Sequence, residues 1–319
     1  MHYRLNTYFG FIIPCAALLL FPTMPSAAAT ADWSKIKGND IMLFYPGQAS
    51  WEWVLTDHSA SKSVKKGTPC LECHKGEEKD MGALLVSGKK MEPTPIKDKP
   101  GSIKANVKFA HDQNHLYVHI EWPASNFHSG NKMDPDYADK IAVMFADGNI
   151  KEATIAGCWG ACHDDATQMA SAAPNDKRKL YLTASRAKLT RHGGGDNLVS
   201  ESELAALQTK GQFMEYWQAK LNDGKAALAS DGYVLEKRHR NDNPQVAAKA
   251  ELKGGTWSVT LSRPLAASGP YRKSFTPGTT YYVGFALHDD YTEGRYHYLS
   301  FGRSLSLDQG DSDFIAPNI

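Results

Sequence analysis

Two short runs of cysteine and histidine hold the residues of this sequence best suited to carry chemistry. Residues 70–74 read Cys-Leu-Glu-Cys-His, and residues 158–163 read Cys-Trp-Gly-Ala-Cys-His, with one more residue between the thiols. In motifs of this kind both sulfurs form thioether bonds to a haem, and the histidine that follows binds the iron. The sequence therefore predicts two covalently bound haem c groups. The expected cofactor-binding residues are Cys70, Cys73, His74, Cys158, Cys162 and His163.

Two other uses of these cysteines explain the sequence less well. Disulfide bonds would leave the histidine after each pair as a coincidence, twice over. A structural zinc site usually takes its cysteine pairs from nearby stretches of chain, and here the pairs are far apart. The fifth cysteine, Cys15, lies in an N-terminal segment that we expect to be removed.

That segment, residues 1–29, has the features of a signal peptide. It begins with the basic residues His2 and Arg4, continues with an apolar run over 9–21, and ends in small residues over 26–29. The run is shorter than the roughly 20 residues that a membrane span needs. We therefore expect a periplasmic or otherwise exported protein with no transmembrane span in the mature chain.

The charge balance excludes one large class of partner. Across 319 residues there are 36 Lys and Arg against 35 Asp and Glu. A balance of this kind gives no extended field that would attract nucleic acid or an anionic membrane. We expect redox protein partners instead, and association into homo- or hetero-oligomers stays open.

The chain after the signal peptide changes character near residue 95. Residues 30–95 form an irregular haem-binding segment, whereas residues 96–319 show repeated strand patterns. Leu116, Val118, Ile120 and Trp122 alternate with polar residues, and Lys253-Gly-Gly marks a hairpin. A stretch at about 164–238 is less strand-like, with a capping box at Ser200 and Glu203. The predicted fold is mainly β: an antiparallel β-sandwich with a partly helical insertion.

An electron-transfer haem needs a second axial ligand, and for the first haem we expect His58. It precedes the first anchor by a segment short enough to fold back across one macrocycle. Met81, just after the anchor, is the alternative, since methionine also serves as an axial ligand.

For the second haem the strand predicted at 281–288 carries the expected ligand, His288. Gly284 and Ala286 share its face, and a glycine inside a strand marks a close approach, here of a flat macrocycle. The alternatives are His297, Met144 and His119.

The stretch from about 105 to 307 resembles the haem-binding domain of the gamma subunits of ethylbenzene and dimethylsulfide dehydrogenases. The similar blocks are 107–122 (VKFAHDQNHLYVHIEW), 139–145 (DKIAVMF), 257–265 (WSVTLSRPL), 282–290 (YVGFALHDD) and 295–300 (RYHYLS). The resemblance implies a β-sandwich that holds haem as an electron relay beside a molybdenum enzyme.

The chain departs from those gamma subunits at the haem itself. They hold a non-covalent b-type haem through methionine and lysine, whereas this chain has Cys158, Cys162 and His163. It looks more like multihaem c-type relatives with an added N-terminal C-x-x-C-H segment. Met144 stays a candidate because its block resembles the family's buried strand. The departure weakens the case for a molybdenum partner.

These features predict a periplasmic dihaem cytochrome c that passes single electrons between respiratory redox partners. One alternative is a haem enzyme with one open-coordination iron that acts on a small substrate. The other is a haem-containing ligand-binding or sensor module. An electron-transfer protein is favoured over an enzyme because only the irregular spacing of the Cys158 motif and the surplus histidines point to an open iron site.

Overall fold

The computed structural model describes residues 31–95, 97–125, 127, 133–166, 168–170, 172, 182–191, 194–195 and 197–319, so the predicted signal peptide lies outside the described residues. The helices are α1 (Trp51–Thr56), α2 (Ser61–Lys65), α3 (Cys70–His74), α4 (Glu78–Val86), α5 (Lys151–Ala156) and α6 (Glu201–Thr209), with 3₁₀ turns η1 (Gly157–Ala161) and η2 (Thr183–Ser185).

Strands make up most of the regular structure. They are β1 (Asn39–Phe44), β2 (Ser102–His111), β3 (His115–Pro123), β4 (Asp139–Asp147), β5 (Met214–Leu221), β6 (Leu228–Val234), β7 (Arg238–Arg240), β8 (Ala247–Lys253), β9 (Thr256–Pro264), β10 (Tyr281–His288), β11 (Tyr298–Leu299), β12 (Arg303–Leu307) and β13 (Phe314–Ala316).

All the described strands belong to one hydrogen-bonded sheet. Its order is β7-β6-β5-β4-β10-β11-β1-β2-β3-β9-β8, with β12 paired to β10 and β13 paired to β12. The pairs are antiparallel except β12 with β13. The prediction of a mainly β, antiparallel fold is confirmed, and the strands form one continuous sheet.

The sheet curls so that strands distant in its order face each other across the core. The rings of Phe109 on β2 and Phe285 on β10 lie 6.4 Å apart. The indole Nε1 of Trp257 on β9 donates to Asp139 Oδ2 on β4 at 2.8 Å. Strand β10 has the predicted alternation: Tyr281, Val283, Phe285 and Leu287 are at most 2% exposed. Such a period-two face is what fixes the register of a strand.

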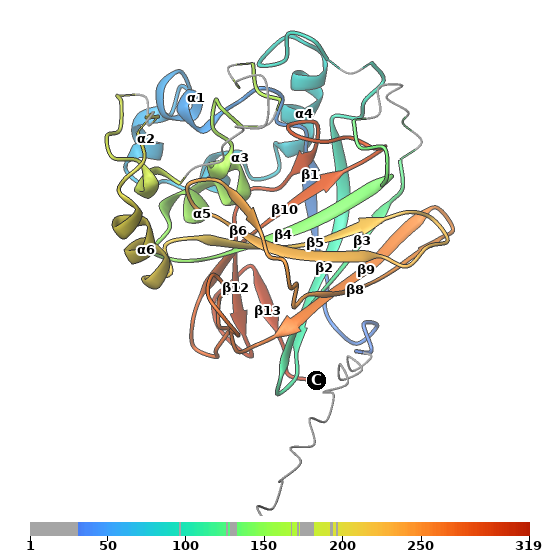
Figure 1. Ribbon diagram of the computed structural model, residues 1–319. Coiled ribbons are helices and arrows are strands. Elements are labelled where there is room, and N and C mark those ends of the chain that lie inside the picture. Colours follow the sequence, from blue (N-terminus) through green and yellow to red (C-terminus); the bar gives the residue numbers. More distant parts are fainter. Residues whose placement is uncertain are drawn as a thin grey trace, which may run out of the picture.

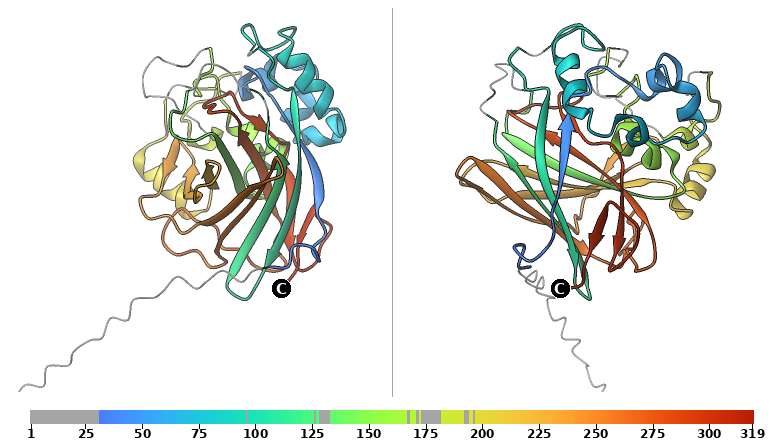
Figure 2. Two further views of the ribbon diagram at one scale, coloured as in Figure 1. Left: turned by 90° about the vertical axis from the view of Figure 1, so that its right-hand side faces the viewer. Right: turned by 180° about the vertical axis from the view of Figure 1, so that it is seen from behind.

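The four N-terminal helices gather at one end of this sheet. Figures 1 and 2 show α1 to α4 together at the end opposite the C terminus. The N-terminal segment also enters the sheet, because β1 lies between β11 and β2. Residues before position 95 therefore supply both a strand of the sheet and the helices at its end.

The segment 164–238 contains both helix and sheet. Helix α6 has the predicted capping box: Ser200 Oγ accepts from Glu203 N at 3.3 Å, and Glu203 Oε2 accepts from Ser200 N at 3.0 Å. The helix ends at Thr209, and β5 begins five residues later between β4 and β6. The helix-forming composition up to Leu221 is overridden because nearly all of β5 is buried between two neighbouring strands.

Turn η1 packs tightly against β10 at Gly284. A Cβ atom added to Gly284 would lie 2.6 Å from the backbone nitrogen of Cys158. The sequence expectation that a macrocycle approaches this glycine is wrong: the main chain of the second anchor occupies the space. The glycine therefore sets where that anchor sits.

We expect Gly284→Ala to lower the free energy of unfolding by about 1–3 kcal/mol, because a methyl group here overpacks the contact with η1. The variant should also carry less haem at the second anchor. Gly148→Ala is the matched control, since its nearest neighbour would be the Tyr282 ring at 3.5 Å. Denaturant unfolding and intact mass check both effects, and equal stability of the two variants would contradict the argument.

Candidate haem-binding sites

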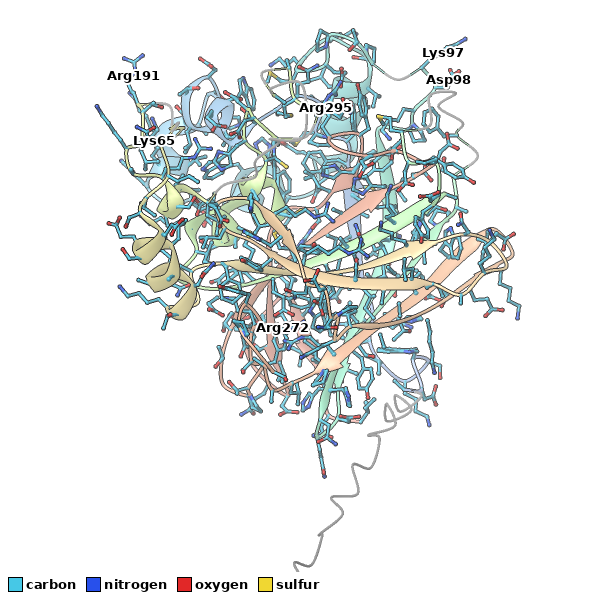
Figure 3. The ribbon with its side chains drawn as sticks, viewed as in Figure 1. Lys65, Lys97, Asp98, Arg191, Arg272 and Arg295 are labelled. Atoms are coloured by element: carbon cyan, nitrogen blue, oxygen red, sulfur yellow. The ribbon has the colours of Figure 1, made fainter. Side chains whose placement is uncertain are left out.

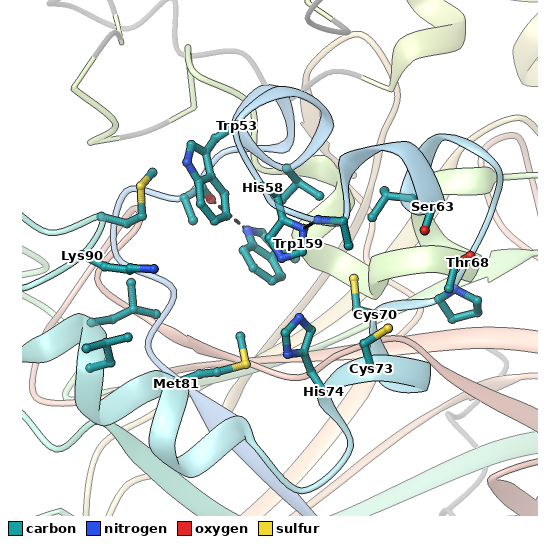
Figure 4. Close-up of a pocket in the computed structure, with 18 residues that line it drawn as sticks. Trp53, His58, Ser63, Thr68, Cys70, Cys73, His74, Met81, Lys90 and Trp159 are labelled. Carbon is teal, nitrogen blue, oxygen red and sulfur yellow. Dashed lines mark hydrogen bonds between the residues drawn. The ribbon is translucent and has the colours of Figure 1, made fainter.

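The first anchor opens onto an apolar cavity with an empty volume of about 800 Å³. Figure 4 shows Cys70, Cys73 and His74 on one side of it, with Trp53 and Trp159 on the other. Helix α3 begins at Cys70, so the helical turn brings both thiols and His74 to the same region. Cys70 is buried and Cys73 is exposed, which places one edge of this cavity at the surface.

Two histidines face each other inside the first cavity. The rings of His58 and His74 have centroids 5.8 Å apart, which leaves room for one metal ion between two imidazoles at about 2 Å from each nitrogen. Nδ1 of His74 lies 2.8 Å from Glu77 Oε2, and Nδ1 of His58 accepts from Ala60 N at 3.1 Å. Each ring thus has Nε2 left for a metal.

The environment of His58 suits a neutral ligand. Burial, helped by the positive charges of His74 and Lys90, lowers the pKa of His58 below its ordinary value. Trp53 meets its ring edge-on at 5.5 Å and restrains it. Met81, the alternative ligand, lines the same cavity from α4. The structure therefore brings both candidates to the first anchor.

The second anchor opens onto a separate and larger cavity, with an empty volume of about 1160 Å³. Its floor is the sheet face formed by β10, β4 and β5. Cross-strand pairing arranges this sheet face in three rows, which are Gly284–Met144–Tyr216, Ala286–Ala142–Gln218 and His288–Lys140–Lys220. All of these residues line the cavity except Gly284, which η1 covers. The two alanines of the middle row leave space above the sheet.

The second anchor lies on η1, above one end of that floor. Cys158 and Cys162 line the cavity. His163 is fully buried but does not line it. Nδ1 of His163 donates to Glu52 Oε1 at 2.7 Å, and Nη2 of Arg186 lies 3.0 Å from the same nitrogen.

Glu52 is a site residue that the sequence did not reveal. Burial raises its pKa, but the hydrogen bond and positive charge of His163, together with the backbone N–H of Asp164, outweigh burial and leave the pKa lowered. A carboxylate that holds the second nitrogen of a histidine fixes its tautomer and raises its basicity toward a metal. No local signal pointed to Glu52, because 111 residues separate it from His163.

The candidates for the second distal ligand separate into two groups. His288, His297 and Met144 line the second cavity. His119 does not, because its ring stacks on Trp33 at 4.7 Å and its Nδ1 lies 2.9 Å from Thr260. Nδ1 of His288 is buried without a hydrogen-bond partner, whereas Nδ1 of His297 donates to the Gly294 carbonyl at 2.6 Å.

At the first anchor both thiols, His74 and His58 line the cavity that a haem would fill. At the second anchor Cys158, Cys162 and His288 line the cavity, and His163 lies buried behind it. An unpaired buried nitrogen costs about 1–3 kcal/mol, and iron binding to His288 would remove that cost. Burial raises the pKa of Cys70 and of Cys162 to about 12, which disfavours the thiolates that zinc requires. None of the four cysteines forms a disulfide. Within the described ranges, no group of three or more His, Cys, Asp or Glu gathers for a metal ion.

Thiol pairs, adjoining histidines and apolar cavities on a β-sheet define the class of c-type haem proteins. The sequence model of the family described as ethylbenzene dehydrogenase matches residues 30–249 and 239–300, and the chain belongs to this family. The resemblance seen in the sequence is thereby confirmed.

Two curated relatives are c-type cytochromes. Cytochrome c-552 of Stutzerimonas stutzeri is 38% identical over 290 residues, which cover 89% of this chain and 90% of the relative. Cytochrome c-551 of Rhodocyclus tenuis is 27% identical over 281 residues, covering 86% and 94%. Both names agree with haem c as the cofactor.

A more distant similarity concerns solved structures. A putative carbohydrate-binding protein from Bacteroides uniformis ATCC 8492 shares 10% identity, with a TM-score of 0.33 over 70% of this chain and 82% of that one. This similarity supports no inference about function. In the described part of the chain, no helix has the length and apolar character to span a membrane.

We expect His58→Ala to open the iron of the first haem, because it removes the imidazole that faces His74. The reduced variant should bind carbon monoxide, measured as a shift in its absorption spectrum. Met81→Ala, which alters the same cavity, should leave the spectrum unchanged. Carbon monoxide binding by Met81→Ala but not by His58→Ala would reverse the assignment.

Proposed function

We propose that the protein is an exported dihaem cytochrome c that passes single electrons between redox proteins. The cysteine and histidine residues of each anchor hold one haem, and each haem supplies a reversible one-electron couple when bound. The family and the class of cofactor follow from the comparisons. The number of haems, the export and the role between redox partners are proposed here.

The observation that carries the proposal is that one turn of chain forms the wall between the two cavities. In η1, Cys158 lines the second cavity while the next residue, Trp159, lines the first. The indole Nε1 of Trp159 donates to the Ala49 carbonyl at 2.8 Å, which fixes the ring. Two haems held on either side of so thin a wall suit transfer of electrons from one to the other.

Aromatic rings continue from this wall to the first ligand. The ring of Phe301 lies 6.0 Å from that of Trp159 and stacks on His74 at 6.0 Å. Phe44 packs against both Trp159 and Phe301. This packing holds the two anchors at a fixed separation and excludes water between them.

The greater exposure of the first anchor supports the first haem as the one that exchanges electrons with redox partners. Cys73 is exposed, whereas Cys158 is only 6% exposed. Basic residues Lys62, Lys65 and Lys66 lie on or beside α2, next to the first cavity, and all are exposed. Lys65 donates to the Arg191 carbonyl at 3.5 Å, and Figure 3 shows both at the edge of the helical end. This surface suits a redox partner with acidic groups.

His58 and His288 complete the proposed iron coordination. His58 faces His74 in the first cavity, and His288 offers an orphaned nitrogen in the second. His297 is the rival of His288, since donation of Nδ1–H to a backbone carbonyl is common among histidine ligands. Single alanine variants of His288 and His297 decide between them, because only loss of the true ligand gives carbon monoxide binding at the second haem.

The central test is a spectrum and a mass of the protein matured by its haem-attachment machinery. Two low-spin haems that ignore carbon monoxide when reduced with dithionite, with an intact mass for two thioether-bound haems, would support the proposal. A wild-type haem that binds the gas readily would favour a haem enzyme or a sensor. A mass with one haem would refute the dihaem assignment.

The carboxylate partners of the two anchor histidines give a further prediction. Glu52→Gln should raise the midpoint potential of the second haem, because a neutral partner makes the imidazole of His163 less basic. Glu77→Gln should raise that of the first haem by less, since Glu77 is 58% exposed at its side chain and Glu52 only 10%. Spectroelectrochemical titration measures both, and a shift of the wrong haem in either variant would contradict the pairing.

A further inference from the structure

The floor of the second cavity has a chemically distinct end. Its outer row is His288–Lys140–Lys220, with the two lysines directly paired across β4 and β5. Like charges directly opposite each other on antiparallel strands destabilise a sheet. A lysine pair that is present beside a cavity despite this cost is expected to serve that cavity.

The two lysines differ in how far their charges are compensated. Lys140 is 3% exposed, and its Nζ pairs with Asp134 Oδ2 at 2.7 Å. Lys220 is half-buried and forms no ion pair among the described residues, although its ammonium group lies 5.0 Å from the ring centroid of Tyr137. Burial and the neighbouring charge of Arg240 lower the pKa of Lys220, although the carboxylate of Asp134 acts in the opposite direction. The ammonium group of Lys220 therefore lacks a carboxylate in direct contact among the described residues, since Asp134 contacts Lys140 instead.

A third cation lines the same cavity from β7. The guanidinium of Arg238 lies 4.7 Å from the ring centroid of Tyr216, with Nη2 3.5 Å from Gln218 Oε1. It also has no carboxylate partner within the described ranges. Arg295, elsewhere on the cavity wall, is paired with Glu92. Glu293 is the acidic residue among the described residues that line the cavity, and it forms no ion pair with Lys140, Lys220 or Arg238.

The cations and the thiols lie at opposite ends of the floor. Cys158 rests on Gly284, and the row that holds the two lysines begins four residues later at His288. At about 3.3 Å per strand residue this spacing is roughly 13 Å. The vinyl groups and the propionates of a haem likewise lie at opposite edges of the macrocycle, so thiols at one end require its carboxylates at the other.

We propose that Lys140, Lys220 and Arg238 bind the propionate carboxylates of the haem attached at Cys158 and Cys162. The assignment rests on the proposed function, because it needs a haem at the second anchor. It fixes the orientation of that haem, with the thioether edge under η1 and the propionate edge against β5 and β7. Asp134 restrains Lys140, while Lys220 and Arg238 receive their counter-charge from the cofactor.

The test uses the mature holoprotein and the variants Lys220→Met and Arg238→Gln, which remove charge but keep much of the side-chain bulk. Each should lower the midpoint potential of the second haem, because a nearby cation favours the reduced iron. Each should also shift the propionate bands in the resonance Raman spectrum of that haem, a readout that a merely structural role would not move. Lys249→Met, at an exposed position on β8, is the matched control and should change neither.

Three results would overturn the assignment. If both variants carry two haems but show unchanged potentials and propionate bands, this assignment is refuted and the proposed function stands. A saturable spectral response of the wild type to phosphate or acetate, lost in Lys220→Met, would show that the cations bind a free anion instead. A mass with a single haem would refute the proposed function and this assignment together.

Discussion

The contact between a backbone nitrogen and a strand glycine holds the second anchor in place. Cys158 N rests where Gly284 has no side chain, and a Cβ atom on Gly157 would come just as close to the backbone of Gly302. Gly157 has φ of 66°, a conformation that glycine adopts without strain. Because η1 can come this close to β10, its two faces become walls of different cavities. Any bulkier residue at these glycines would move both walls at once.

Helix α1 couples the two sites from the opposite side. Its six residues place Trp53 against His58 and Glu52 against His163. The backbone N–H of Trp51 donates to the Cys162 carbonyl at 2.6 Å, and Ser50 caps the helix. A short helix with so many contacts acts as a rigid spacer. The geometry of one anchor and its cavity is therefore mechanically linked to the geometry of the other.

Local patterns predicted what depends on neighbours in the sequence. The Gly254-Gly255 turn, with both φ values positive, joins β8 to β9 as the sequence indicated, and the first thiol motif falls on the single short helix α3. The sequence could not show that Glu52 meets His163 or that Lys140 pairs with Lys220, since tertiary contacts create both. It also gave a helical interpretation to residues that form β5, where burial between two strands outweighs helix propensity.

The place of β1 in the sheet has a consequence for maturation. β1 comes from the start of the described chain, yet it pairs with β11 near the C terminus, with Phe44 opposite Leu299. A chain that crosses a membrane from its N terminus therefore cannot complete the sheet until almost all of it has arrived. Cys158 is nearly inaccessible once η1 has packed on β10. In the proposed exported cytochrome, haem attachment at Cys158 would therefore have to precede the packing of η1 on β10 and the closure of the sheet.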